Sequence, residues 1–562
     1  MSPPLHVRWL GTVPYREAHS LQRGLFAHGC DDYLLLLEHP HVYTAGVRAE
    51  PANMLVDPTT VGADFVEADR GGDLTYHGPG QLVGYPILTV PGKRGGGMAD
   101  TVAYVRSVEQ LVIDALTELG LPETGRVAGF PGVWADPGSE APRKIAAIGV
   151  RLSRGRSMHG FALNVAPDLE MFDHIVPCGI AGKSVTSVAA EGCDASMREV
   201  VDVFARLAAA RWGTGGTSRA DVAWRVRPSD LSPFSRGAGP GEVVRPTEHG
   251  TNVRLRGRLA AAGVDEGRPL RDRKPDWLRP RVSFDRSVLG VKATMRELDL
   301  VTVCEEAGCP NLSECWSDGT ATFMLAGERC TRACGFCLVD TRKPLALDPG
   351  EPERVAEAVD RMDLEYVVLT SVARDDLGDG GASQFAATIA AVRTRRPHAR
   401  VEVLIPDCRG DVEALRVIIE ARPDVLNHNL ETVARLQRAV RPSAGYARSL
   451  AVLARAKAAG LVTKSGLVTG MGESDEEVHE ALSDLRGVGV DIVTIGQYLR
   501  PTSHHLPVDR WVPPSTFVEW KAFGEQLGIE HVESSPLTRS SYHARGASDA
   551  AGVVPVRLSV PS

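Results

Sequence analysis

Residues 304–337 read CEEAGCPNLSECWSDGTATFMLAGERCTRACGFC, and this stretch holds six of the ten cysteines of the chain. The six form two triplets, one spaced C-x4-C-x5-C and one spaced C-x3-C-x2-C: Cys304, Cys309 and Cys315, then Cys330, Cys334 and Cys337. Three thiolates on a 4Fe-4S cluster leave one iron open to a substrate, whereas four ligands close a structural zinc site. The count of three in each group therefore favours two iron-sulfur clusters.

Two other uses of these cysteines are considered. A zinc site would need a fourth ligand for each triplet, typically from paired C-x2-C motifs. Disulfides are disfavoured because the sequence shows no secretory leader and the other cysteines are scattered. Three of those, Cys30, Cys193 and Cys408, are expected to be small buried hydrophobic residues. Thiols kept reduced to hold iron predict a cytoplasmic location.

The second triplet has the spacing of radical S-adenosylmethionine enzymes, in which the open iron binds the amino and carboxylate groups of the cofactor. With the first triplet and GTATFM (319–324), the chain resembles lipoyl synthase. The resemblance covers about 300 residues and continues through TSVARDDLGDGGA (370–382), NHNLETV (427–433), KSGLVTGMGE (464–473), GQYLRPTSHH (496–505) and RSSYHA (539–544).

This resemblance implies two 4Fe-4S clusters, S-adenosylmethionine, and an electron donor such as ferredoxin or flavodoxin. It assigns the second triplet to the radical cluster and the first triplet to an auxiliary cluster. Ser541 would be the fourth ligand of the auxiliary cluster, although a serine in this position could equally cap a turn. Asn429, Glu431 and Lys464 are expected to contact cofactor or cluster, or to be satisfied structural groups.

The C-terminal fold is predicted from alternating apolar and helical segments. Seven short apolar runs are separated by helical patterns: ATFMLA, YVVLTSV, VEVLIP, DVLNHN, VTKSGLV, DIVTIG and IEHVES. Alternation of strands and helices predicts a parallel sheet, here a partial (β/α)6 barrel of the radical S-adenosylmethionine type. The second triplet follows the first run, where the catalytic loops of such barrels lie.

Residues 1–215 read as a separate α/β and α+β unit, a mixed sheet with helices packed against it. Apolar residues recur at helical spacing from Val102 to Leu119, and Gly120 and Pro122 are expected to end this helix. Short apolar runs separated by glycine and proline predict the strands.

Three segments of this unit suggest chemistry. They are the glycine-rich RGGDLTYHGPG (70–80), Lys144 at the start of an apolar run, and Cys178 in HIVPCGIAGKSVTS. An isolated cysteine is usually a buried hydrophobic residue. A neighbouring ammonium, however, lowers the pKa of a thiol and makes it nucleophilic. A Cys/Lys pair beside a loop of backbone amides would suit acyl transfer through a thioester.

These motifs, in the order RGG-x3-YHGPGQ, RKI-x2-IG, HGFALN and PCGI, resemble lipoyl(octanoyl) transferase, a relative of biotin and lipoate ligases. The resemblance implies that Cys178 forms the acyl-enzyme and that Lys144 activates it. It also implies that three segments line the acyl site: Arg70, Gly71, Gly72, Asp73, Leu74, Thr75, Tyr76, His77; Ala147, Ile148, Gly149; and Gly160, Phe161, Ala162.

An ATP-dependent ligase is the alternative for this unit. The RGR at 154–156 faintly resembles the phosphate loop of biotin ligases. It falls between two strand-like runs, so a solvated hairpin turn explains the two arginines. A ligase would also have no need of Cys178.

Residues 216–262 are rich in Gly, Pro and Ser and are expected to be a flexible linker to a second unit at 263–562. The formal net charge of -8 argues against nucleic-acid binding, and no apolar stretch is long enough to span a membrane.

The prediction is a bifunctional enzyme of lipoate biosynthesis, an octanoyltransferase joined to a sulfur-inserting enzyme. Its expected partners are octanoyl-acyl carrier protein, lipoyl domains of 2-oxoacid dehydrogenase complexes, and the glycine cleavage H protein. The alternatives are a radical methylthiotransferase, or a two-cluster electron-transfer protein, fused to a ligase of the biotin or lipoate type.

Overall fold

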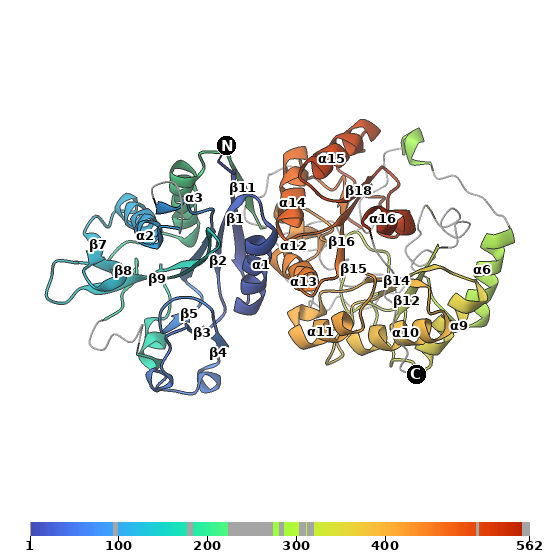
Figure 1. The fold of residues 1–562 in the computed structure, drawn as a ribbon, viewed down its shortest axis with the longest axis horizontal. Helices are drawn as coiled ribbons and strands as arrows, with labels where there is room; N and C mark the ends of the chain where they lie inside the picture. The colour runs from blue at the N-terminus through green and yellow to red at the C-terminus, as the bar shows by residue number, and fades with distance from the viewer. Residues whose placement is uncertain are drawn as a thin grey trace. The chain divides into compact units, whose positions relative to one another are not determined.

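The N-terminal apolar runs form a mixed sheet, as predicted (Figure 1). The computed structural model describes residues 2–93, 99–176, 184–222, 274–279, 286–302, 311, 320–501 and 505–552. Within these residues the sheet has the order β11-β1-β2-β6-β10-β9-β8-β7. Its strands are β1 (Leu5–Thr12), β2 (Asp32–Glu38), β6 (Gln81–Ile87), β7 (Thr124–Val127), β8 (Phe130–Ala135), β9 (Arg143–Ser153), β10 (Arg156–Asn164) and β11 (Thr217–Asp221).

A smaller sheet and three long helices complete this unit. The small sheet has the order β4-β3-β5, with β3 (Val42–Ala45), β4 (Asp64–Glu67) and β5 (Leu74–His77). The helices are α1 (Tyr15–His28), α2 (Thr101–Glu118) and α3 (Met197–Trp212). Helix α1 packs on β6 and β10, and α2 packs against α3.

Helix α2 confirms the helix predicted from Val102 onwards. The Asp100 side chain caps it by accepting a hydrogen bond from the amide of Ala103 at 3.0 Å. Gly120 has a φ of 95°, a left-handed conformation that ends the helix as expected. Val102, where the apolar repeat starts, lies in the first turn and is 61% exposed.

The hairpin predicted at 154–156 joins β9 to β10. Arg154 and Gly155 have φ values of 52° and 76°, as a tight two-residue turn between twisted strands requires. Arg154 is exposed, but the prediction was wrong for Arg156. The side chain of Arg156 is only 12% exposed, and its guanidinium lies 3.9 Å from Asp32.

The sheet of the first unit continues beyond residue 215. Strand β11 pairs in parallel with β1, from Leu5 opposite Thr217 to Trp9 opposite Asp221. The first compact unit spans Met1–Val222, so the start of the expected linker at 216 belongs to this sheet. Residues 223–262, the rest of that linker, lie outside the described residues.

In the C-terminal unit all seven apolar runs form strands of one parallel sheet in sequence order, as expected of a partial barrel. The strands are β12 (Thr320–Leu325), β13 (Tyr366–Ser371), β14 (Arg400–Leu404), β15 (Val425–Asn427), β16 (Val462–Thr469), β17 (Ile492–Gln497) and β18 (His531–Ser534). The strands follow sequence order because a helix leads from the end of each strand back to the start of the next, which then pairs beside it.

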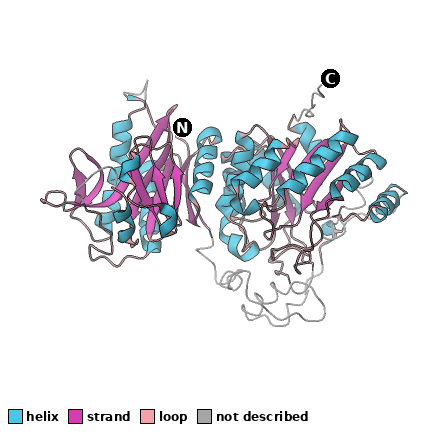
Figure 2. Cartoon of the chain, turned by 90° about the horizontal axis from the view of Figure 1, so that it is seen from below, coloured by secondary structure: helices cyan, strands magenta, loops and turns pink. Residues whose placement is uncertain are grey.

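Helices cover the outer side of these strands (Figures 1 and 2). They are α6 (Arg286–Glu297), α9 (Glu351–Arg361), α10 (Ala382–Arg395), α11 (Val412–Glu420), α12 (Gln437–Val440), α13 (Tyr446–Ala458), α14 (Asp475–Gly487), α15 (Pro514–Gln526) and α16 (Ala544–Ala550). The core between sheet and helices includes Val367, Leu369, Val401, Val403 and Phe385. No helix in the described ranges is long and apolar enough to cross a membrane.

The cysteines outside the two triplets differ in exposure. Cys408 is buried and Cys193 is partly buried, whereas Cys30 is exposed, so the expectation of burial was wrong for Cys30. No cysteine in the described part of the chain forms a disulfide.

Because His39 is buried, we expect the stability of the N-terminal unit to fall in acid. Burial lowers its pKa from 6.5 to about 4, and its Nδ1 hydrogen bonds the Val13 carbonyl at 2.6 Å. Between these pH values only the unfolded chain takes up the proton, so stability falls as the pH drops. By pH 5 the loss is about 2 kcal/mol.

The variant His39→Gln should therefore lose less stability than the wild type between pH 7 and pH 5. Pulse proteolysis in urea measures this difference, because the N-terminal unit that is still folded survives digestion as a separate fragment. Equal losses in the two proteins would contradict the assignment of this pH dependence to His39.

Candidate functional site

A cavity of about 380 Å³ lies at the carboxyl ends of the parallel strands. Its wall includes residues at or just after the ends of all seven strands: Met324, Ser371, Pro406, Asn429, Val468, Tyr498 and Ser541 among them. Loops from successive strands meet at this edge because parallel strands all point the same way. The second cysteine triplet follows β12 and lines this cavity, as predicted.

The loop that carries this triplet is tied to two neighbouring strands by Arg332. Its guanidinium donates two hydrogen bonds of 2.8 Å to Asp375, after β13, and one of 2.6 Å to Asp407, after β14. Arg332 and Asp407 are both buried. Backbone bonds add to this anchoring, from the amide of Cys330 to the Asp340 carbonyl and from Gly335 to the Val440 carbonyl.

The three thiols fit an iron-sulfur cluster better than a single metal ion. Zn–S bonds of about 2.3 Å would bring the sulfurs within about 4 Å of one another. Among the described residues, the three cysteines do not form a group whose ligand atoms all lie within 4.8 Å. Burial raises the pKa of all three thiols, so their thiolates need a cationic partner such as iron.

Ser541 and two of the three expected cofactor contacts line the same cavity. Asn429 donates hydrogen bonds to Glu431 at 3.0 Å and to the hydroxyl of Ser540 at 2.6 Å. Its side-chain oxygen Oδ1 is buried without a partner, and Glu431 has a left-handed φ of 66°. Asn429 thus joins the end of β15 to the turn that holds Ser541.

Lys464 is not among the residues that line the cavity. It lies in β16, fully buried, with its ammonium 3.0 and 3.1 Å from the two carboxylate oxygens of Glu402. Glu402 also accepts hydrogen bonds from Tyr366 at 2.7 Å and Asn427 at 3.2 Å. The structure therefore favours the second of the two roles considered for Lys464, a satisfied structural group.

Replacing Lys464 alone should destabilise the C-terminal unit. Lys464→Met leaves the Glu402 carboxylate buried without its cation, at a cost of about 3–5 kcal/mol. Adding Glu402→Gln removes that charge while keeping an acceptor for Tyr366, so the double variant should recover most of the stability.

Chemical denaturation measures the free energy of unfolding of the three proteins. A matched readout is binding of S-adenosylmethionine to the reconstituted double variant. A folded double variant that no longer binds the cofactor would restore Lys464 as a contact residue.

The first triplet, Cys304, Cys309 and Cys315, lies outside the described residues. Asn311, between the second and third of these cysteines, is described and buried. Its side-chain amide donates a 2.7 Å hydrogen bond to the carbonyl of Leu537, four residues before Ser541. This contact was not anticipated, because nothing in the local pattern distinguishes Asn311 from a turn residue.

The N-terminal unit holds a smaller cavity, of about 50 Å³, lined by most of the predicted acyl-site residues. Of the predicted set, those that line it are Arg70, Gly71, Gly72, Asp73, Thr75, His77, Ala147, Ile148, Gly149, Gly160, Phe161 and Ala162. Leu74 and Tyr76 do not, because alternate side chains of β5 point to opposite faces. Both instead pack with Tyr43 and Phe172 in a separate apolar cluster.

Arg70 and Asp73 hold the glycine-rich loop in place. The buried Arg70 guanidinium donates to the carbonyl of Thr44 at 2.6 Å and to its hydroxyl at 2.8 Å. Asp73 accepts hydrogen bonds from the Glu50 amide at 3.1 Å and the Asn53 side chain at 2.5 Å. The loop before β5 is thereby tied to β3 and to the segment that follows β3.

Lys144 is buried at the start of β9, as its sequence position suggested. Its ammonium lies over the ring of Trp134, 5.4 Å from the centroid. Its backbone pairs with the segment after Cys178, since its amide donates to Ser184 and its carbonyl accepts from Thr186, both at 2.9 Å. Cys178 lies outside the described residues, six positions before Ser184.

Four residues that sequence reasoning did not single out also line this cavity: Tyr15, Val83, Tyr85 and His159. Tyr15 begins helix α1, far from the quoted motifs. His159 is the first residue of the HGFALN motif, directly before Gly160, and has a φ of 58°. Pairing of β10 with β6 brings His159 near Val83 and Tyr85, and packing of α1 on both strands adds Tyr15.

Two family models match separate parts of the chain. Residues 14–208 match the lipoyl protein ligase A/B catalytic domain, and residues 324–485 match the radical SAM superfamily. The first match contains the smaller cavity, and the second contains the loop of Cys330, Cys334 and Cys337.

Curated relatives match the C-terminal part. Lipoyl synthase of Rubrobacter xylanophilus is 56% identical over 273 residues, which cover 48% of this chain and 85% of the relative. Lipoyl synthase of Mycobacterium leprae is 51% identical over 304 residues, covering 54% of this chain and 97% of the relative. A bipartite lipoate protein ligase of Thermoplasma acidophilum, a solved structure, is 18% identical, covers 39% of this chain and 86% of that chain, and has a TM-score of 0.32.

Proposed function

The chain belongs to the lipoyl synthase family through its C-terminal part and carries a lipoyl protein ligase A/B catalytic domain, and from this premise we propose two consecutive reactions. The N-terminal unit moves an octanoyl chain from its carrier to a lysine of a lipoyl domain. The C-terminal unit then inserts sulfur at carbons six and eight of that chain. The observation that carries the proposal is the presence of two separate cavities, each lined by its own predicted motif residues.

Acyl transfer is proposed to run through a thioester on Cys178. The Lys144 ammonium would lower the pKa of the thiol, and the hydrogen-bonded pairing of Lys144 with Ser184 and Thr186 keeps the segment after Cys178 beside β9. An ATP-dependent ligase is less well supported, since Arg156 of the candidate phosphate loop bonds instead to the Asp31 carbonyl.

The cavity must widen to take the substrate. An engineered cavity of about 150 Å³ admits benzene, a six-carbon molecule, whereas this one measures about 50 Å³. We infer that an octanoyl chain separates the glycine-rich loop from strands β9 and β10 as it enters.

The proposed partners follow from these reactions. The acyl donor is octanoyl-acyl carrier protein, and the acceptors are lipoyl domains of 2-oxoacid dehydrogenase complexes and the glycine cleavage H protein. A ferredoxin or flavodoxin would supply electrons. We place the reactions in the cytoplasm, where thiols stay reduced.

Sulfur insertion is proposed to need two 4Fe-4S clusters and S-adenosylmethionine. Cys330, Cys334 and Cys337 would hold one cluster, and Asn429 and Glu431 would contact the cofactor beside it. When bound, these groups supply the radical chemistry and the sulfur, which no side-chain base can provide at unactivated carbons. Arg332 keeps the loop at the strand ends, and the cavity walls enclose the acyl chain.

The first triplet is proposed to hold the second cluster together with Ser541. Asn311, which stands between Cys309 and Cys315 in the sequence, supports this, because its side-chain amide donates to the carbonyl of Leu537, four residues before Ser541. A serine alkoxide is a weak ligand for iron compared with a thiolate. Ser541 could therefore leave the cluster when sulfur is delivered.

Octanoyl-carrier protein should add one octanoyl mass to the peptide that contains Cys178. The variants Cys178→Ser and Lys144→Met should lose this adduct, the first because the nucleophile is gone and the second because the thiol is no longer activated. Mass spectrometry of the digested protein measures it. Acyl transfer that requires ATP, or that persists in Cys178→Ala, would contradict the thioester route.

Anaerobic reconstitution should give about eight irons per chain, from two 4Fe-4S clusters. Replacing the second triplet by alanine should halve the iron and abolish reductive cleavage of S-adenosylmethionine to 5'-deoxyadenosine. Replacing the first triplet should also halve the iron but leave that cleavage intact while stopping sulfur insertion. Cleavage that survives loss of Cys330, Cys334 and Cys337 would reverse or refute the assignment.

A further inference from the structure

A row of aromatic rings runs along one side of the N-terminal cavity. The ring of His77 stacks on Tyr15 at 6.1 Å between centroids, Tyr15 stacks on His19 at 6.1 Å, and His19 stacks on His159 at 5.5 Å. Tyr15, His77 and His159 line the cavity itself. The row therefore leads from β5 to the turn end of strand β10.

The row begins at His77, which a path of hydrogen bonds connects to the backbone of Lys144. His77 hydrogen bonds Gln81 at 2.7 Å, and Gln81 donates to Asn164 at 2.9 Å. Asn164 in turn donates to the carbonyl of Thr186, whose amide bonds to the Lys144 carbonyl. His159 lies at the other end, opposite Val150 in the β9–β10 pairing.

The lined part of strand β9 has about the length of the acyl chain. It runs from Ala147 to the position opposite His159, which is Val150. Three residues of extended strand span about 10 Å. Eight carbons at about 1.3 Å each, from standard C–C bond lengths, also span about 10 Å. A chain that starts at the Lys144 end would place its terminal methyl group near His159 and Tyr15.

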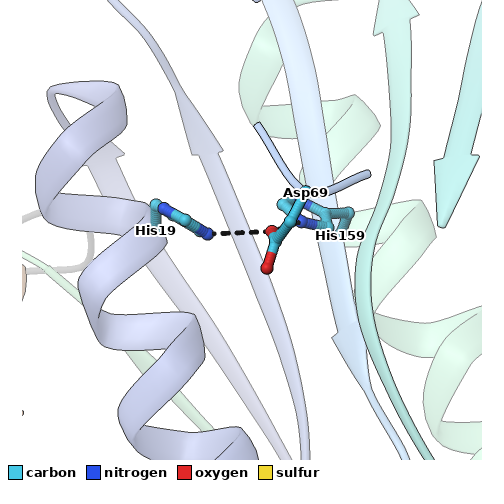
Figure 3. A group of neighbouring side chains, drawn as sticks. All are labelled: His19, Asp69 and His159. Carbon is cyan, nitrogen blue, oxygen red and sulfur yellow. Dashed lines mark hydrogen bonds and ion pairs between the residues drawn. The ribbon is translucent and has the colours of Figure 1, made fainter. Parts of the chain in front are cut away.

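His159 is held in place by Asp69, which also pairs with His19 (Figure 3), and by Gln22. Its Nε2 lies 2.8 Å from the Oδ1 of Asp69, and the Nε2 of His19 lies 3.1 Å from the same oxygen. The His159 amide donates to the side chain of Gln22 at 2.9 Å. These bonds stabilise a left-handed backbone that a non-glycine residue in a strand rarely adopts.

Two polar atoms at this end of the cavity have no partner in the structure. They are the hydroxyl of Tyr15 and the Nδ1 of His159, whose side chains are 4% and 1% exposed. Buried polar atoms without partners are costly, so a water molecule or a polar ligand atom is expected between the chain end and this wall. A longer apolar chain would displace that water without replacing its hydrogen bonds.

The cluster of His19, Asp69 and His159 is less suited to a metal ion. Its three ligand atoms lie within 4.8 Å of one another, which would allow one. However, the guanidinium of Arg151 is paired with the second oxygen of Asp69, next to where the cation would bind. A metal on His159 Nε2 would also move the proton to Nδ1, where no acceptor is present.

We propose that Tyr15 and His159 form the distal wall of the acyl cavity and limit the acyl chain to about eight carbons, with Asp69 and His19 positioning the His159 ring. This inference rests on the proposed acyl transfer and adds the residues that set its chain length. None of the four was marked by the sequence motifs as part of the acyl site.

The test uses the full-length protein with octanoyl- and decanoyl-carrier proteins as donors. Tyr15→Phe removes only the hydroxyl, and His159→Asn removes the ring while suiting the left-handed backbone. The double variant should raise the ratio of decanoyl to octanoyl kcat/KM about fifteenfold, the factor expected from burying two more methylenes. His6→Asn, which breaks a comparable 3.0 Å pair with Asp31 away from the cavity, should leave the ratio unchanged.

An unchanged ratio in a folded double variant would overturn the proposal, and Tyr15→Phe alone decides the matter if His159→Asn fails to fold. Calorimetric binding of free octanoate and decanoate to Cys178→Ala protein gives a readout that needs no acyl transfer. A decanoate preference that appears only in the wall variants supports the proposal even if acyl transfer itself fails. Failure of both acids to bind would overturn the proposal. It would also be overturned if the wild-type protein bound one zinc ion tightly and the His19→Asn variant did not.

Discussion

The C-terminal site depends most on the ion pairs that the guanidinium of Arg332 forms with Asp375 and Asp407. The guanidinium lies between the buried Asp407 and the partly exposed Asp375, so the charges of Arg332 and Asp407 are removed from water and must satisfy each other. Such an arrangement stabilises only when its geometry is good, and it is intolerant of losing one partner. Because the two carboxylates follow neighbouring strands, the cysteine loop is fixed relative to the sheet rather than to its own chain neighbours.

The common direction of the strands explains why the cavity forms at their carboxyl ends. Parallel strands all end at one edge, so loops distant in sequence converge there. Asn429 and Ser541 are separated by more than a hundred residues, yet Asn429 bonds to Ser540. The interior of the sheet is used differently, since Glu402 in β14 and Lys464 in β16 satisfy each other inside the core.

In the N-terminal unit, a path of hydrogen bonds between buried polar groups connects parts of the site. The path from His77 through Gln81 and Asn164 to Thr186 links the glycine-rich segment to the strand of Lys144. Each amide in this path is both donor and acceptor, which fixes side-chain orientation. The two units thus use different physical means to hold one cavity each, consistent with two reactions in one bifunctional enzyme.

Sequence by itself determined the strand order of the C-terminal unit, the hairpin at Arg154 and the site loops around Cys330 and Lys144. These features depend on local periodicity, spacing and turn chemistry, which are written in consecutive residues. It did not determine which way Leu74 and Tyr76 point, that Lys464 is neutralised by Glu402, or that β11 completes the first sheet. Nor did it reveal the contact of Asn311 or the wall of Tyr15 and His159. Those depend on pairings between residues far apart in the chain, and only the tertiary structure decides such pairings, because burial and hydrogen bonding select among many locally acceptable arrangements.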